Sequence, residues 1–175
     1  MKYDAETVKQ WAGDSQWRAL RAEFARYGDH GYSRWSAPSF WALVIHRLQR
    51  GCPWAPLRIV KKLFTLATLI DIHPNARIGP GFLIVHGGPL WIHADTTFGA
   101  DCSILHGCTI GAMHEKTGAT IGDHVSIGCH ATILGRVKIG DGALIAANTL
   151  VLCDVPAGCT AIGVPAKNLP RMPYN

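Results

Sequence analysis

From Ile72 onward the sequence repeats every six residues, and this period limits the folds available to the chain. Branched or bulky apolar residues recur at that spacing in three uninterrupted runs. They are Ile72, Ile78 and Ile84; Ile92, Phe98, Ile104 and Ile110; and Ile121, Ile127, Ile133, Ile139, Ile145 and Val151. Neither the period of an α-helix nor the two-residue alternation of a flat strand explains this pattern. The chain is therefore predicted to wind as a parallel β-helix whose coils stack around one core.

Two further positions of the repeat support the same fold. Small or branched residues stand four places after most of the apolar ones, which implies a second inward position. Cys102 and Cys108 are two of them, and we interpret both as core residues rather than metal ligands. Glycine directly follows six of the apolar residues, where we expect tight corners that need a residue without Cβ. These glycines are Gly79, Gly99, Gly111, Gly122, Gly128 and Gly140.

Residues 1–70 have a different pattern, with apolar residues spaced as on helices. We expect helices over 17–28, 39–51 and 56–69. Their predicted apolar faces are Trp17, Leu20, Phe24 and Tyr27; Phe40, Leu43, Val44 and Leu48; and Leu57, Val60, Phe64 and Ala67. His46 is expected to have a core or surface role. This segment also holds 11 Lys and Arg against 5 Asp and Glu, a net charge of +6. It could therefore touch a membrane surface or an acidic partner, although a solvated helix face is the simpler explanation of the charge and the one we favour.

Composition favours a compact cytoplasmic protein. With 175 residues and 48% hydrophobic content, the chain can bury a core without disulfides or metal. Its start, MKYDAETVKQWAGDSQW, is too polar for a secretory signal, and its most apolar stretch, LFTLATLI, is far too short to span a membrane. The six cysteines contain no C-x-x-C pair, so we expect reduced thiols.

Several motifs occur in an order that is typical of one family. They are DIHP (71–74), IGPG (78–81), HGG (86–88), SILHGCTIG (103–111), TIGDHVSIG (120–128) and GVPAK (163–167). With these motifs the chain resembles the hexapeptide-repeat acyltransferases, and within them the serine acetyltransferases and the relatives that acetylate sugars of surface polysaccharides. The resemblance implies a mainly β fold, a left-handed parallel β-helix over residues 71–160. The helical segment 1–70 precedes it, and a tail, 161–175, follows. The resemblance also implies a homotrimer that uses acetyl-CoA as co-substrate and needs no metal.

The resemblance places a catalytic dyad on Asp71 and His86. A neutral histidine can take a proton from an alcohol, while a carboxylate fixes its tautomer and stabilises the imidazolium. The two residues are fifteen positions apart, nearly one coil of about three hexads, so both are expected near one edge of stacked coils. Directly after His86 the repeat lengthens from six residues to eight. Gly87 and Gly88 there would let backbone approach the substrate and donate an N–H to an oxyanion.

A second insertion forms a predicted protruding loop, 111–120, because Ile110 and Ile121 are eleven residues apart. In the family such a loop reaches the neighbouring subunit, which makes His114 a candidate acceptor contact or a plain surface residue. The resemblance also implies that the pantetheine arm of acetyl-CoA lies against Ala112, Cys129 and Ala147. Lys167 is a candidate contact for the CoA phosphates.

Two departures from the serine acetyltransferases bear on the acceptor. Those enzymes have an Asp before the catalytic His, which holds the ammonium of serine, but here the acceptor-side residue is Val85. They also carry an Asp-Arg-His-Pro run in the long loop, which GAMHEKTGAT lacks. We therefore expect a sugar hydroxyl of a surface polysaccharide or its precursor as acceptor, with L-serine as the alternative. The short helical segment and the ending MPYN argue against a hexamer and against a complex with cysteine synthase.

Other functions remain as alternatives. A zinc-dependent carbonic-anhydrase-like β-helix would need two histidines five residues apart, and the sequence has no such pair. A non-catalytic β-helix scaffold would explain the hexads but not the insertion after His86. No nucleic-acid partner is expected.

Overall fold

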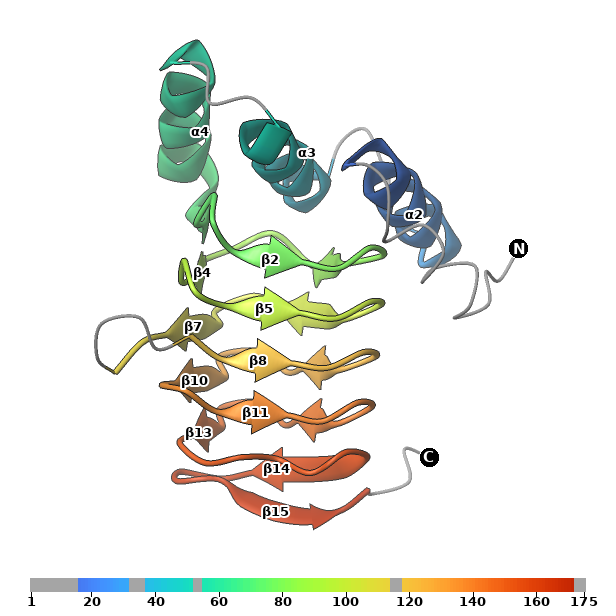
Figure 1. Cartoon of the computed structure of the whole chain (residues 1–175), viewed down its shortest axis with the longest axis vertical. Coiled ribbons are helices and arrows are strands. Elements are labelled where there is room, and N and C mark those ends of the chain that lie inside the picture. The colour runs from blue at the N-terminus through green and yellow to red at the C-terminus, as the bar shows by residue number, and fades with distance from the viewer. Residues whose placement is uncertain (1–15, 32–36, 52–54, 114–117, 172–175) are drawn as a thin grey trace.

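The computed structural model describes residues 16–31, 37–51, 55–113 and 118–171, and it consists of a stack of coils with helices at one end (Figure 1). The helices are α2 (Gln16–Asp29), α3 (Pro38–Gly51) and α4 (Ala55–Thr68). The three helices predicted from residue spacing are confirmed. Within the described residues, no helix is both long enough and apolar enough to cross a membrane.

Each of the first four coils contributes one strand to each of three faces, and the last coil contributes strands to the first and third faces. The first face contains β1 (Ile70–Ile72), β4 (Leu90–Ile92), β7 (Thr109–Gly111), β10 (Thr132–Leu134) and β13 (Leu150–Val151). The second contains β2 (Arg77–Ile78), β5 (Thr97–Phe98), β8 (Thr120–Ile121) and β11 (Lys138–Ile139). The third contains β3 (Leu83–Val85), β6 (Ser103–Leu105), β9 (Ser126–Ile127), β12 (Leu144–Ile145), β14 (Cys159–Ile162) and β15 (Lys167–Pro170). All pairs are parallel except β14 with β15, so the predicted parallel β-helix is confirmed.

The register of the strands stacks equivalent hexad positions on one another. On the third face Ile84 pairs with Ile104, and Ile104 pairs with Ile127. These side chains are at most 1% exposed, and the inward residues of the other faces are buried as well. The continuous apolar core predicted from the six-residue period is therefore confirmed.

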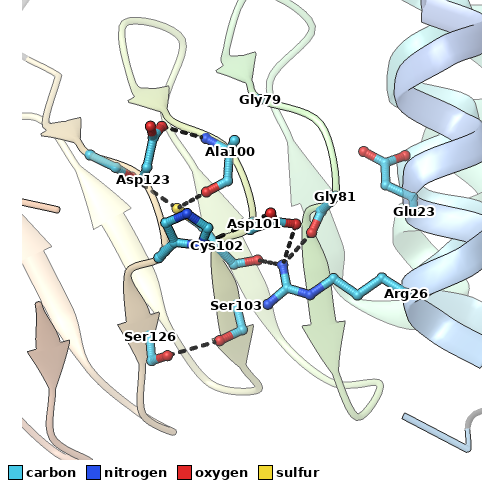
Figure 2. Close-up of polar contacts among 12 residues, drawn as sticks. Glu23, Arg26, Gly79, Gly81, Ala100, Asp101, Cys102, Ser103, Asp123 and Ser126 are labelled. Atoms are coloured by element: carbon cyan, nitrogen blue, oxygen red, sulfur yellow. Dashed lines mark hydrogen bonds and ion pairs between the residues drawn. The ribbon is translucent and has the colours of Figure 1, made fainter. Parts of the chain in front are cut away.

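The corner glycines are required for a different reason from the expected one. Gly99 and Gly122 do not adopt positive φ angles; instead a carboxylate of the next coil occupies the space beside them. A Cβ on Gly122 would lie 2.1 Å from Oδ1 of Asp141. The carboxylates bind the preceding coil, since Asp123 Oδ1 accepts a hydrogen bond from the backbone N–H of Ala100 at 2.8 Å (Figure 2). Close approach of neighbouring coils, rather than turn conformation, requires glycine at these positions.

Helices α2 and α3 cap the first coil, whose carbonyl groups have no coil above them to pair with. Arg47 of α3 donates to the carbonyls of Ile78 at 2.6 Å and Gly79 at 2.7 Å. Arg26 of α2 donates to the carbonyl of Gly81 and to that of Cys102 in the next coil (Figure 2). These guanidinium groups donate hydrogen bonds to backbone carbonyls that would otherwise be unpaired at the end of the β-helix.

The predicted helix faces are wrong at four positions, one of which is the exposed Ala67. Trp17, Leu48 and Val60 are 66%, 37% and 49% exposed. In α2 the predicted Tyr27 is buried, together with Ala19, Ala22 and Glu23, which were not predicted. The helix approaches its neighbours through small side chains and a buried carboxylate, which a search for large apolar residues does not detect. His46 is 2% exposed, so its role is in the core.

The end of the β-helix is closed by a hairpin. β14 continues the third face, and β15 returns antiparallel to it, with Thr160 paired to Leu169. Residues on both sides of the proposed boundary at 160 therefore share one sheet. The division into 1–70, 71–160 and 161–175 stays a prediction.

Candidate active site

Asp71 stands at the centre of β1, between two buried isoleucines, so its side chain leaves the wall of the β-helix. Its Cα is paired with that of Trp91 in the next coil. The carboxylate is 40% exposed, and its Oδ1 accepts a hydrogen bond from Nζ of Lys61 at 2.7 Å. Lys61 lies on α4, which places a helix residue beside a candidate site residue of the first coil.

His86 occupies the corner between the third and the first face. Its backbone is left-handed, with φ of 65°, and the residue is exposed. Gly107, His130 and Asn148 adopt the same conformation at equivalent corners, each three residues after an inward isoleucine. His86 follows Ile84 by only two residues. The left-handed conformation is thus a general property of this corner, and the two-residue insertion changes which residue adopts it.

Asp71 lies one residue after Ile70, which begins β1 next to the corner that holds His86. The corner that begins at His86 leads into Leu90, whose Cα pairs with that of Ile70 and whose N–H donates to the carbonyl of Leu69 at 3.0 Å. The insertion therefore lies next to the start of β1. Direct contact between the carboxylate and the imidazole stays a prediction.

Three imidazoles follow one another along this edge, one on each successive coil. The ring centroids of His86 and His106 are 6.1 Å apart, and those of His106 and His130 are 5.2 Å apart. Among the described residues, Nδ1 of His106 is buried without a hydrogen-bond partner. Sequence reasoning treated His106 and His130 only as spacings between histidines. Their positions at the same corner of consecutive coils would have predicted the stack.

The glycines after His86 differ from each other. Gly88 has φ of 150°, and a Cβ there would lie 3.0 Å from Cβ of His106. Gly87 has open space around its Cα, with no atom within 4 Å of a Cβ. Backbone at Gly87 is thus accessible to a bound molecule, whereas Gly88 lets the imidazole of the next coil pack closely. Their proposed oxyanion role stays a prediction.

The residues expected to bind the cofactor do not share one edge. Cys129 and Ala147 lie at the corner that also holds His86, and the N–H of Asn148 donates to the carbonyl of Cys129 at 2.9 Å. Ala112 follows β7 and therefore lies at the opposite edge of the first face. Lys167 is exposed on β15. Val85 is half-buried at the end of β3, and His114 is outside the described residues.

Charged and titratable groups act on His73, two residues after Asp71. Burial lowers the pKa of His73, and the positive charge of Lys61 lowers it further. His93 and Asp95 belong to the same group of charges, and the ring of His93 packs against Trp91 with centroids 6.1 Å apart. Sequence reasoning missed Lys61, because its position depends on helix docking. It also missed Trp91, although the six-residue register would have placed Trp91 next to Asp71. A pocket of about 650 Å³ beside this group is lined by Gln49, Pro74, Asn75, Arg77, Ala94, Asp95, Thr96 and Thr97.

The buried cysteines have a structural role. Burial raises the pKa of Cys102 to about 12 and that of Cys108 to about 11. Each thiol donates to a carbonyl of the next coil at 3.0 Å, that of Gly122 and Gly128 respectively. In the part of the chain that the structure describes, no three His, Cys, Asp or Glu side chains form a group that could hold a metal ion.

Known proteins resemble this chain in sequence and in structure. The family described as bacterial transferase hexapeptide (six repeats) matches residues 118–153. The serine acetyltransferase of Synechococcus elongatus is 37% identical over 142 residues, which are 77% of this chain and 58% of that protein. The serine acetyltransferase of Helicobacter pylori is 36% identical over 141 residues, which are 77% of this chain and 82% of that protein. This chain therefore spans little more than half of the first relative and most of the second.

Solved structures extend the likeness to the fold. The Neisseria gonorrhoeae serine acetyltransferase superposes with a TM-score of 0.80 at 28% identity, covering 91% of this chain and 68% of that one. A serine acetyltransferase in complex with CoA superposes with a TM-score of 0.75 at 28% identity, covering 94% and 74%. The hexapeptide-repeat β-helix with helices before it is thus common to this chain and to these structures.

Proposed function

Because the chain belongs to the serine acetyltransferase-like family of hexapeptide-repeat acyltransferases, we propose that it transfers the acetyl group of acetyl-CoA to the hydroxyl group of L-serine. The observation that carries the proposal is the 36% identity to a serine acetyltransferase of which this chain covers 82%. The fold agrees with it over 91% of the chain.

The acceptor is the point on which sequence motifs and relatives disagree. Val85 in place of an acidic residue led to the expectation of a sugar hydroxyl. The relatives and solved structures carry the name serine acetyltransferase, which favours L-serine and gives no support to a polysaccharide acceptor. With Val85 apolar and half-buried, the serine ammonium must be held by another group. A comparison of L-serine with sugars as acceptors therefore decides which hydroxyl is acetylated.

His86 is the proposed general base. Its imidazole accepts the proton of the serine hydroxyl as that oxygen attacks the thioester carbonyl carbon, forming a C–O bond. The C–S bond then breaks, and the CoA sulfur leaves with the proton that the imidazolium returns. Asp71 orients the imidazole and stabilises its cationic form. The exposure of His86 and the pairing of Leu90, four residues later, with Ile70, which precedes Asp71, support these roles.

Acetyl-CoA is the proposed co-substrate, bound between subunits of a homotrimer. One of the superposed structures is a complex with CoA. Ala112 and Cys129 lie at opposite edges of the first face, so a single subunit does not bring them to one groove. A rotationally symmetric assembly brings one edge of each subunit to the other edge of its neighbour. This separation supports a site shared by two subunits, with Cys129 and Ala147 from one and Ala112 from the other.

Further parts of the proposal concern location and other contacts. The described cysteines are free thiols, which supports a cytoplasmic location. Lys167 as a phosphate contact, His114 as an acceptor contact and weak association with a membrane surface remain predictions of the sequence.

The test measures CoA thiol release with L-serine and, separately, with free and nucleotide-linked sugars. His86→Asn is the informative variant because Asn tolerates the left-handed backbone. His124→Asn is its control, since His124 is also exposed and left-handed, with φ of 57°, but lies at a different corner. We expect turnover with serine, a loss of about a thousandfold in His86→Asn and little change in His124→Asn. Turnover with a sugar but not with serine would overturn the proposed acceptor, and full activity of His86→Asn would overturn the proposed base.

A further inference from the structure

We propose that Lys61 is a positioning residue of the active site, whose ammonium group holds one carboxylate oxygen of Asp71 so that the other is directed to His86. The inference rests on the proposed function, because it assumes that Asp71 and His86 act together. It adds a residue of the helical segment to a site otherwise built from the β-helix.

The contact itself is short and partly shielded from water. Lys61 Nζ lies 2.7 Å from Asp71 Oδ1, with the lysine side chain 20% exposed and the carboxylate 40% exposed. Lysine side chains on a helix are usually extended into solvent, as the exposed neighbour Lys62 is. Lys61 instead reaches the first strand of the β-helix.

The packing of α4 determines where the ammonium lies. Phe64, one turn after Lys61 on the same side of the helix, packs against the core. Lys61, Phe64 and Thr65 line a small cavity together with Ile70 and Ile72 of β1. Thr65 Oγ1 donates to the carbonyl of Ile70 at 3.1 Å, which ties the helix to the residue before Asp71. The position of Nζ is therefore set by the docking of α4 on β1.

Asp71 needs such a partner because only its backbone is fixed. The pairing of β1 with β4 and the burial of Ile70 and Ile72 hold its Cα in place. A carboxylate 40% exposed would otherwise rotate among several rotamers. A charge-assisted hydrogen bond to one oxygen selects one orientation and leaves the second oxygen for the imidazole. A carboxylate that is already oriented before the substrate binds lowers the activation free energy more than one that must be oriented during the reaction.

Positioning and simple charge have opposite effects on the pH dependence. Lys61 contacts Asp71 and lines a small cavity with His46 of α3. The charges of Lys61, Asp71, His93 and Asp95 all act on His73, and His106 lies beside His86. If Lys61 acted only as a nearby positive charge, its removal would make protonation of His86 easier. If Lys61 orients Asp71, its removal weakens the hydrogen bond between the carboxylate and the His86 imidazolium and makes protonation of His86 harder. The direction of the shift therefore distinguishes the two roles.

The experiment compares Lys61→Met, Lys61→Arg and the matched control Lys62→Met in the full chain. In Lys61→Met we expect kcat with L-serine to fall about ten- to a hundredfold with little change in KM for acetyl-CoA. The acid limb of kcat/KM moves to lower pH. Lys61→Arg recovers most of the rate because it keeps a cationic donor, and Lys62→Met behaves as wild type. Thermal unfolding of each variant shows whether the fold is retained.

A double-mutant cycle tests whether Lys61 acts through Asp71. In an Asp71→Asn background, Lys61→Met is expected to have no further effect. Additive losses, an acid limb that moves to higher pH, or equal rates in Lys61→Met and Lys62→Met would each overturn the inference. If wild type does not acetylate serine, the proposed function fails. The role of Lys61 is then tested by the NMR titration midpoint of His86, whose signal is assigned by its loss in His86→Asn. We expect that midpoint at lower pH in Lys61→Met; an unchanged or higher one overturns the inference.

Discussion

Arg47 and Glu23 form a buried ion pair between α3 and α2, with Nη2 of the arginine 2.5 Å from Oε1 of the glutamate. Arg47 also donates to two carbonyls of the first coil, so one guanidinium joins two helices and the β-helix. Arg47→Ala would leave the buried carboxylate and both carbonyls without this donor. We expect it to lower the free energy of unfolding by about 3–5 kcal/mol. Urea titration measures this, with Arg21→Ala, at an exposed site on α2, as a control expected to stay within about 0.5 kcal/mol of wild type.

Glu23 makes part of the stability depend on pH. Burial raises the pKa of its carboxyl above the ordinary value of 4.5, against the lowering effect of Arg47. Its Oε2 has no hydrogen-bond partner among the described residues, which agrees with this direction. A raised folded-state value means that the contribution of Glu23 is fully present below pH 4.5 and is lost as pH rises through the higher folded-state value.

The unfolding free energy of wild type relative to Glu23→Gln should therefore decrease as pH rises above 4.5. The difference between the two unfolding free energies cancels the contributions of the other carboxyl groups. One of these is Asp101, whose pKa is also raised by burial. Urea titrations of both proteins across this range provide the measurement. A difference that grows with pH would mean that Arg47, rather than burial, dominates.

The thiols should differ in reactivity. Because burial raises the pKa of Cys102 to about 12 and that of Cys108 to about 11, neither forms much thiolate near neutral pH. Cys153 is exposed. Iodoacetamide at pH 8 should alkylate Cys153 in the folded protein, and Cys102 and Cys108 only after denaturation. Peptide mass mapping checks this, and equal labelling of Cys102 and Cys153 without denaturant would contradict the structure.

The coils were predictable because one physical rule generates them. A six-residue period allows the register that stacks Ile84, Ile104 and Ile127, so the core follows from the sequence without knowledge of distant contacts. The helical cap was predictable as three helices but not in its docking. Trp17 looked like a core residue and is 66% exposed, because α2 meets its neighbours through alanines and Glu23.

The candidate site also contains residues that could be predicted and one that could not. Asp71 and His86 were expected near one edge from their spacing, and the pairing of Ile70 with Leu90 brings the segment after His86 next to the start of β1, while a contact between the two side chains stays a prediction. Lys61 was not predictable, because its contact with Asp71 depends on the angle at which α4 docks on β1. Residues that meet through strand register can be found from a repeat, whereas residues that meet through helix docking cannot.

Gly122 provides a direct test of how the coils fit together. A Cβ there would lie 2.1 Å from Asp141 Oδ1 and 2.9 Å from the backbone nitrogen of Asp141. Gly122→Ala should displace the carboxylate from the N–H of Asp123, which it now binds at 2.8 Å, and lower the free energy of unfolding by about 2–4 kcal/mol. Gly142→Ala is the control, because a Cβ there meets no atom within 4 Å and only its φ of 66° is unfavourable.

Adding Asp141→Ala to Gly122→Ala should recover only part of the loss. The double variant removes the side-chain overlap but leaves the overlap with the backbone nitrogen and the missing hydrogen bond. The two changes are therefore expected to be less than additive in urea titrations, since they affect one contact. A Gly122→Ala variant no less stable than Gly142→Ala would mean that the coils can separate freely at this corner. In that case the close approach seen at Gly99 and Gly122 would not be what requires glycine there.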